Sequence, residues 1–263
     1  MSHPYFFVKS ENISGDKIII KGDDFNHLIN VLRVKTGGMV EISDNIRYRY
    51  KARLEQIKKQ EGFLSVVEKE RIYKQLPEIT LFQCILKKEA MELAVQKTAE
   101  IGIAEIVPVF SRRVILDESK IKNKRERWQT IAEQASKQCR RDFICSVLDP
   151  LNIDEILPSK YSLFYIPYEE ASADGIVNGT INTNVYADKI FKDIDCKMKN
   201  GDLKNIGYVI GPEGGFEESE AKLLRTRGAA IVSLGRNILR AETASIYFLS
   251  ILDFVIKNSH EQK

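Results

Sequence analysis

Cysteine and histidine are scarce in this 263-residue sequence, which has four of the first and three of the second. The cysteines fall at no metal-ligand spacing and form no Cys-x-x-Cys pair, so neither a zinc site nor a disulfide framework is predicted. A charged, apolar and small-residue leader of the secretory kind is also missing from the first residues. We therefore expect a globular protein of the cytoplasm that holds no metal.

Two common nucleotide-binding signatures are absent as well. No Gly-x-Gly-x-x-Gly opens a helix, and no Gly-x-x-x-x-Gly-Lys-Ser/Thr is present. These absences disfavour a Rossmann methyltransferase or dehydrogenase and a P-loop enzyme, because those classes bind their nucleotide-containing ligands through such Gly-rich loops.

Charge is divided unevenly along the chain, although the net charge is only +3. Residues 1–72 carry 13 lysines and arginines against 10 acidic residues, residues 87–142 carry 13 against 9, and residues 143–263 carry 13 against 17. A nucleic-acid backbone is bound mostly through lysine and arginine. The division therefore favours an RNA-facing first half followed by a part that binds a small molecule.

The first 72 residues are rich in predicted strands, at 5–8, 17–20, 39–43, 47–57 and 63–68, with one helix at 23–33. In the fourth strand, basic residues alternate with tyrosine, alanine and leucine, so one face carries a basic stripe made of Arg47, Arg49, Lys51 and Arg53. Its cations repeat every ~6.7 Å, which is comparable with the spacing of phosphates along RNA. The basic stripe is therefore either an RNA-binding surface or a solvated face, balanced by Glu41, Glu68 and Glu70 on neighbouring strands.

A polar connection at 70–78 marks the predicted boundary between two domains. Beyond it, strands are predicted at 79–86, 103–110 and 161–166, helices at 88–101, 120–141 and 189–199, and a polar surface loop at 171–186. Continuous apolar strands that alternate with helices are typical of an α/β domain with a buried parallel sheet.

Two strand-to-loop junctions stand out between residues 206 and 240. An apolar strand ends at Ile210 and leads directly into Gly-Pro-Glu-Gly-Gly at 211–215, and a short strand at 229–234 leads into a second loop that ends at Arg240. A helix with acidic residues in its first turn lies between the two loops. The spacing of about 25 residues predicts adjacent parallel strands, with a ligand site built from both loops at the carboxyl ends of the strands.

The last helix, predicted from Glu242 to Ile256, is apolar on every face. It is shorter than the ~20 apolar residues that a bilayer span requires, and it contains Asp253, so it is not expected to cross a membrane. One small domain cannot cover such a helix on all sides. We therefore expect a homodimer with this helix in or near the interface.

Four motifs, taken together and in order, are specific for a known family. They are His-Leu-x-x-Val-Leu-Arg at 27–33, Glu-Leu-Ala-Val-Gln-Lys-x-x-Glu-Ile-Gly at 92–102, Gly-Pro-Glu-Gly-Gly-Phe at 211–216 and Leu-Gly-x-x-Ile-Leu-Arg-x-Glu-Thr-Ala at 234–244. Over nearly its whole length the chain resembles the SPOUT methyltransferases, and in particular the ribosomal RNA uridine methyltransferases of the RsmE family.

The resemblance implies a PUA-like RNA-binding β-barrel for residues 1–72 and a SPOUT α/β domain for residues 73–263, whose mostly parallel sheet is tied in a deep trefoil knot. It also implies a homodimer. The activity it implies is methylation of a uridine at ring nitrogen 3 in 16S rRNA of the small ribosomal subunit, with S-adenosylmethionine as the methyl donor.

Roles for individual residues follow from their position and chemistry, together with the resemblance. Arg240 is expected to stabilise negative charge on the uracil, with Glu213 and Glu242 as candidates for the base or the orienting group. The first of three cofactor loops is expected to begin at 167–170. The expected cofactor contacts are Ile166, Pro167, Gly211, Pro212, Gly214, Gly215, Leu234, Gly235, Ile238, Leu239 and Thr243. RNA is expected to contact the basic stripe and three further residues, Arg33, Arg140 and Arg141, the last two in a segment similar to a family segment near the active site.

Two alternatives stay open at this point. The chain could be a non-catalytic RNA-binding protein whose Gly-rich loops only turn the chain, or a SPOUT methyltransferase with another ribosomal or transfer RNA target. Cofactor binding separates the first alternative from an enzyme, and the motif at 27–33 argues against the second. The order of the two glutamates, and the choice between free RNA and an assembled subunit as substrate, are left open by the sequence.

Overall fold

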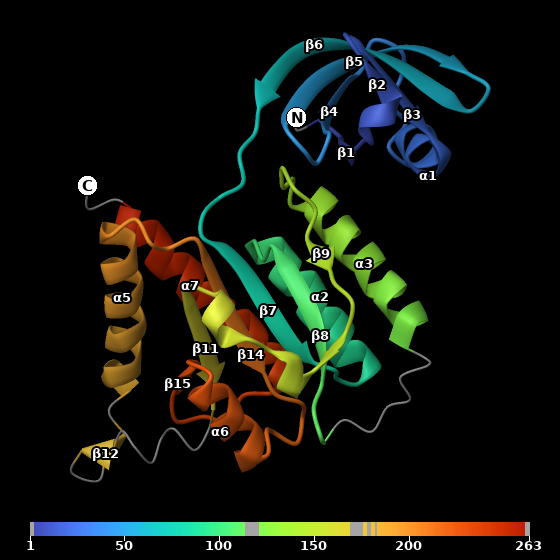
Figure 1. Ribbon diagram of the computed structural model, residues 1–263. Coiled ribbons are helices and arrows are strands. Elements are labelled where there is room, and N and C mark those ends of the chain that lie inside the picture. The colour runs from blue at the N-terminus through green and yellow to red at the C-terminus, as the bar shows by residue number, and fades with distance from the viewer. Residues whose placement is uncertain (1–2, 114–120, 169–175, 178–179, 182, 261–263) are drawn as a thin grey trace. The chain divides into compact units, whose positions relative to one another are not determined.

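The computed structural model describes residues 3–113, 121–168, 176–177, 180–181 and 183–260 (Figure 1). By its internal contacts the chain divides into two compact units. The first is Met1–Lys74 with Ser136–Ile144, and the second is Gln75–Ala135 with Cys145–Lys263. Within the described part of the chain, no helix combines the length and the apolar character that a membrane crossing requires.

The first unit is built on a six-stranded sheet with the strand order β1-β4-β5-β6-β3-β2. Strands β1 and β4 run parallel, and the other neighbouring pairs run antiparallel. Its elements are β1 (Tyr5–Phe7), η1 (Ser10–Asn12), β2 (Ile13–Ser14), β3 (Lys17–Lys21), α1 (Gly22–Asn26), η2 (His27–Val31), β4 (Met39–Ser43), β5 (Tyr48–Lys58) and β6 (Glu61–Arg71).

The alternation predicted for the fourth strand is confirmed in β5. Tyr50, Ala52 and Leu54 are buried in the core of the first unit, whereas the side chains of Arg49 and Lys51 lie on the outer face. The helix predicted at 23–33 is wrong in its form. The chain passes from a short α-helix into one turn of π-helix, and a left-handed φ of +54° at Arg33 follows it.

The segment 136–144 belongs to the first unit because it makes hydrogen bonds with the strands of that unit. The hydroxyl of Ser43 donates to the carbonyl oxygen of Asp142 at 2.6 Å, and the hydroxyl of Tyr5 donates to the carbonyl oxygen of Arg141 at 2.7 Å. The helix predicted to run to residue 141 therefore stops early, at the end of α3 (Ile121–Gln138). Tertiary bonds to distant residues decide this boundary, and the local pattern does not contain them.

The second unit is an α/β domain with a parallel sheet in the order β10-β8-β7-β14-β11-β15, with β9 paired to β8. Its first elements are β7 (Glu78–Cys84), α2 (Lys88–Ile101), β8 (Glu105–Phe110), α3, β9 (Ser146–Val147), β10 (Leu151–Asn152), η4 (Ile153–Glu155) and η5 (Pro158–Lys160). Then follow β11 (Leu163–Pro167), β12 (Ile176–Val177), β13 (Thr180–Ile181), α5 (Thr183–Lys199), β14 (Asn205–Ile210), α6 (Glu218–Thr226), β15 (Ala230–Val232) and α7 (Ala241–His260). The predicted parallel α/β architecture is confirmed.

Both faces of this sheet are covered, which explains why its strands are continuously apolar. Leu81 of β7 and Tyr208 of β14 pack into one core together with residues of α2, α3, α5 and α7. Their neighbours in sequence, Phe82 and Val209, pack into a second core with residues of α6 and η4. The sheet therefore lies between two helical layers, and its strand ends are free to carry loops.

The expected adjacency of the last two strands is wrong. β11 lies between β14 and β15 and runs parallel to both of them. The chain therefore leaves β14, forms α6, and reaches the far side of β11. Local spacing indicates a helical crossover, but it does not specify whether another strand lies between the two that are joined.

Part of the polar stretch at 171–186, predicted as a loop, has regular structure. β12 and β13 pair antiparallel at 176–181, and α5 begins at Thr183, six residues before the predicted start. The sequence does contain a hairpin signal, because Asn-Gly at 178–179 lies between β-branched residues. The prediction of a loop rested on the polar composition of the stretch and missed this signal. Residues 169–175, 178–179 and 182 lie outside the described part of the chain.

The last helix, α7, is only partly covered within one chain. Phe248 and Leu252 are fully buried in the core. On another side of the helix, Tyr247 is 47% exposed and Phe254 is 68% exposed. A single copy of this chain therefore leaves one side of the helix uncovered, as expected from the sequence, and the homodimer that would cover it stays a prediction.

Candidate active site

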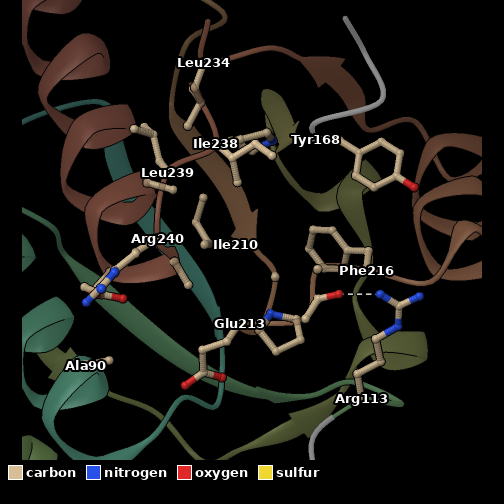
Figure 2. Close-up of a pocket in the computed structure, with 18 of the residues that line it drawn as sticks. Ala90, Arg113, Tyr168, Ile210, Glu213, Phe216, Leu234, Ile238, Leu239 and Arg240 are labelled. Atoms are coloured by element: carbon tan, nitrogen blue, oxygen red, sulfur yellow. Dashed lines mark hydrogen bonds between the residues drawn. The ribbon is translucent and has the colours of Figure 1, made fainter. Parts of the chain in front are cut away.

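A cavity of about 880 Å³ lies where loops follow the parallel strands β11, β14 and β15 (Figure 2). Its walls are residues 167–168, 210–216, 234–235 and 237–242, together with residues before and within α2 and Arg113 beyond β8. The volume is within the range of roughly 300–1,000 Å³ that small-molecule sites have. Both loops that the sequence singles out thus line one cavity at the carboxyl ends of the strands.

The Gly-rich loop at 211–215 requires glycine for both space and conformation. A Cβ atom at Gly211 would lie 3.3 Å from the ring of Phe216, which is buried against it. Gly215 has a φ of +69°, and its N–H donates to the carbonyl of Pro212 at 2.9 Å, which closes the turn. The loop therefore turns tightly and presents main chain to the cavity.

A buried carboxylate fixes the position of the Gly-rich loop. Glu220, in the first turn of α6, is only 2% exposed. Its two oxygens accept the backbone N–H groups of Arg112 at 2.9 Å and of Glu217 at 2.8 Å. Because Glu217 caps α6 and Arg112 follows β8, this one side chain ties the helix after the loop to the neighbouring part of the sheet.

The second loop, at 234–240, forms an apolar wall. Leu234 and Leu239 are half-buried, and Ile238 is 78% exposed and lines the cavity. Figure 2 shows these three side chains together on the side of the cavity opposite Arg113. Gly235 has a φ of +114°, a conformation that only glycine adopts readily, so the loop turns here.

The three candidates for catalysis all line the cavity: Arg240, Glu213 and Glu242. Arg240 lies where the second loop meets α7, and its carbonyl accepts the N–H of Ala244 at 2.8 Å. Oε1 of Glu213 accepts the backbone N–H of Lys87 at 2.9 Å, and Lys87 is the residue that caps α2. One carboxylate oxygen of Glu213 is therefore already engaged in holding a helix end.

Most of the expected cofactor contacts line the cavity, and two do not. The lining set contains Pro167, Gly211, Pro212, Gly214, Gly215, Leu234, Gly235, Ile238 and Leu239. Ile166 is fully buried within the sheet, and Thr243 is exposed on α7 outside the lining set.

The basic stripe of the first unit is partly neutralised. Arg49 forms ion pairs with Glu70 at 2.7 Å and with Asp142 at 3.2 Å, and Lys51 pairs with Glu68 at 2.7 Å. The hydrogen bond with Glu70 is the main cause that raises the pKa of Arg49. These pairs match the interpretation of a solvated face balanced by glutamates, and a role of the basic stripe in RNA binding stays a prediction.

The other three RNA-binding candidates also belong to the first unit. Arg140 donates to the carbonyl of His3 at 2.7 Å and lies 3.8 Å from a carboxylate oxygen of Glu41. The carbonyl of Arg141 accepts the Tyr5 hydroxyl described above. Arg33 is exposed directly after η2. The side chain of Arg140 and the main chain of Arg141 therefore already have partners within the first unit. A role of these three arginines in RNA binding stays a prediction.

Lys87 and Arg113 line the cavity but were not singled out from the sequence, whereas Tyr168 and Phe216 lie in the segments 167–170 and 211–216 that were singled out without a role for these two side chains. Lys87 and Arg113 follow β7 and β8, so the rule that ligands bind at the carboxyl ends of parallel strands could have found them. The ring of Tyr168 lies 6.4 Å from that of Phe216. Among the described residues, no group of three His, Cys, Asp or Glu side chains is placed to hold a metal ion.

Comparison with known protein families accounts for both units. A model described as RNA methyltransferase domain matches residues 74–253, and a model described as RNA methyltransferase PUA domain matches residues 20–67. The first match lies in the second unit except for residue 74 and the segment 136–144, and the second match lies within the first unit. The chain belongs to the RNA methyltransferase family.

Individual relatives agree with this assignment. The ribosomal RNA small subunit methyltransferase E of Bacillus subtilis is 28% identical over 240 residues, which cover 89% of this chain and 89% of that protein. The structure of the enzyme of the same name from Neisseria gonorrhoeae, bound to S-adenosylmethionine, matches with a TM-score of 0.77 and 26% identity, and covers 97% of this chain and 98% of that chain. A methyltransferase from Legionella pneumophila with bound S-adenosylmethionine matches with a TM-score of 0.76 and 27% identity, over 97% of this chain and 98% of that chain. The resemblance to the RsmE family and the expected PUA-like part are confirmed.

Proposed function

We propose that this protein transfers a methyl group from S-adenosylmethionine to a uridine, at ring nitrogen 3, in 16S rRNA of the small ribosomal subunit. The observation that carries the proposal is the cavity, where the Gly-rich loop, the apolar second loop, Arg240 and two carboxylates meet. The Bacillus subtilis relative is named as a small-subunit ribosomal RNA methyltransferase, and the Neisseria gonorrhoeae structure holds S-adenosylmethionine. Both support the proposal.

The residues at the cavity fit the cofactor. Gly214 and Gly215 leave the main chain bare toward the cavity, and Leu234, Ile238 and Leu239 offer an apolar wall for an adenine ring. When bound, S-adenosylmethionine would supply the methyl group as an electrophile activated by its sulfonium. The protein then has to hold the uracil in line with it, because positioning accounts for much of the rate of such a transfer.

Methylation at ring nitrogen 3 requires that nitrogen to lose its proton, which spreads negative charge over the flanking carbonyl oxygens. Arg240 would stabilise this charge, since its guanidinium stays charged at every relevant pH and lies at the rim of the cavity. Glu213 accepts the backbone N–H of Lys87 at the start of α2, so we assign it the orienting role. Glu242, in the first turn of α7, is then the candidate base.

The proposal extends to the organisation of the chain. We propose that residues 1–72 form the RNA-binding PUA-like domain, and that residues 73–263, apart from the segment 136–144 that packs in the first unit, form a SPOUT domain with a trefoil knot. A homodimer would cover Tyr247 and Phe254, which α7 leaves exposed in a single copy. Sedimentation that finds only the 30.1 kDa species at micromolar concentration would contradict the dimer. Ribosomal subunits as substrate agree with the cytoplasmic location expected from the sequence.

The experiment is a transfer assay with radiolabelled S-adenosylmethionine and small ribosomal subunits from cells that lack this protein, beside deproteinised 16S rRNA. The proposal predicts label in the RNA and one cofactor site per chain by calorimetry. A protein that binds RNA, but that neither binds the cofactor nor transfers label to the RNA, would instead be the non-catalytic alternative. The comparison of subunits with free RNA decides which of the two is the substrate.

A further inference from the structure

Arg113 has no part in the mechanism above, yet its side chain reaches the cavity. It follows β8 and, as Figure 2 shows, its guanidinium extends toward the Gly-rich loop, where Nη1 donates to the carbonyl of Gly214. A Cβ atom built on Gly214 would lie 3.6 Å from Cδ of Arg113, so the stem of the arginine lies along the loop. The hydrogen bond to Gly214 therefore fixes where this cation is presented.

The charges around the cavity restrict where an RNA backbone can approach. Four carboxylates line it: Glu89, Glu213, Glu218 and Glu242. A phosphate is repelled by each of them, so it has to be received at a cation. The lining cations are Lys87, Arg113 and Arg240.

Of these cations, Arg113 is the best suited to a phosphate. Arg240 is assigned to the uracil, and Lys87 lies directly beside the carboxylate of Glu213, which accepts its backbone N–H and would repel a phosphate there. A guanidinium has five N–H donors, and the bond to Gly214 uses one nitrogen of Arg113. No carboxylate in the described part of the chain lies within ion-pair distance of it, and a guanidinium matches the geometry of a phosphate.

The preceding residue has the same charge and exposure but faces elsewhere. Arg112 forms an ion pair with Glu217 at 3.1 Å and a hydrogen bond with Ser219 at 3.1 Å, and it is not among the residues that line the cavity. Arg112 and Arg113 therefore form a matched pair, in which one cation is neutralised on α6 and the other is presented at the cavity.

We propose that Arg113 binds a backbone phosphate next to the uridine that is methylated, and that its bond to Gly214 holds the guanidinium in place for this contact. The proposal rests on the function proposed above, because it needs an RNA whose target base enters the cavity. It adds a substrate contact beside the Gly-rich loop, made by a residue of the second unit that does not belong to the basic stripe.

The test compares Arg113→Ala and Arg113→Lys with the control Arg112→Ala. Transfer to small ribosomal subunits from cells that lack this protein is measured with radiolabelled S-adenosylmethionine, and cofactor affinity is measured by calorimetry. Arg113→Ala should raise the KM for subunits about tenfold or more, since a hydrogen bond to a charged group is lost. It should also reduce the slope of log K for subunit binding against log salt concentration by about one. The cofactor Kd should stay within about threefold of that of the unaltered protein. Arg113→Lys should recover part of the KM, and Arg112→Ala should match the unaltered protein.

Two results would overturn the proposal. If Arg113→Ala weakens cofactor binding and leaves the KM for subunits unchanged, the arginine only supports the loop. If Arg112→Ala and Arg113→Ala raise the KM equally, the increase comes from the loss of positive charge in general and not from a specific phosphate contact. Failure of the proposed function is recognised separately, because the unaltered protein would then transfer no label at all. Melting temperatures of the three variants exclude unfolding as the cause.

Discussion

Replacing Gly214 by valine should weaken S-adenosylmethionine binding without unfolding the protein. The nearest atom to a Cβ at this position is Cδ of Arg113 at 3.6 Å, an ordinary van der Waals contact, so the fold has room for the side chain. The added methyl groups would occupy space at the cavity that the cofactor needs. Overpacking of this kind costs about 1–3 kcal/mol, which corresponds to a loss of affinity of roughly 5- to 150-fold.

Calorimetry with S-adenosylmethionine measures the affinity, and thermal melting checks the fold. Gly201→Ala is the matched control, because Gly201 has a φ of +71° and lies outside the cavity lining. Its left-handed backbone should make alanine cost about 1 kcal/mol of stability, or roughly 2–4 °C in Tm, with no change in affinity. If the Gly214→Val protein is folded and binds the cofactor as tightly as the unaltered protein, the assignment of the Gly-rich loop is wrong.

Three further predictions follow from the same contacts. Arg240→Ala should reduce the single-turnover transfer rate on the order of a hundredfold while calorimetry finds cofactor affinity within about threefold, since its charge acts when the uracil becomes anionic. Glu220→Ala should lower the free energy of unfolding by about 2–5 kcal/mol in urea titrations, because two backbone N–H groups lose the buried carboxylate that accepts them, and a loss below 1 kcal/mol would contradict this. Burial raises the pKa of the Cys84 thiol above its ordinary value of 9.0, so its contribution to stability is complete below that pH and is lost as the pH rises further. Tm measured from pH 7 to 10.5 should therefore fall above about pH 9, and less so in Cys84→Ala.

Local pattern was sufficient for the elements that have a clear period. Alternation in β5 indicated which side chains are buried, and continuous apolar runs indicated β7 and β14 as buried parallel strands. The Gly-rich loop at 211–215 could be recognised because tight turns at strand ends need glycine. Both loops of the cavity were therefore predictable as a pair.

Contacts between distant residues were beyond the reach of the sequence. The position of β11 between β14 and β15 depends on how crossovers are placed on the sheet, and no local period encodes it. The bond from Arg113 to Gly214 joins residues 101 positions apart, and the capping of α2 by Glu213 spans 126 positions from Lys87. Such pairs become visible only when the strand order is known.

The most direct test of the proposed activity is a map of methylated uridines in 16S rRNA, obtained by mass spectrometry from cells with and without this protein. We expect one uridine to lose methylation at ring nitrogen 3 when the protein is absent. We also expect that the unaltered gene restores the mark and that an Arg240→Ala gene does not. Identical maps from the two kinds of cell, or a lost mark at a ribose or another base atom, would contradict the account.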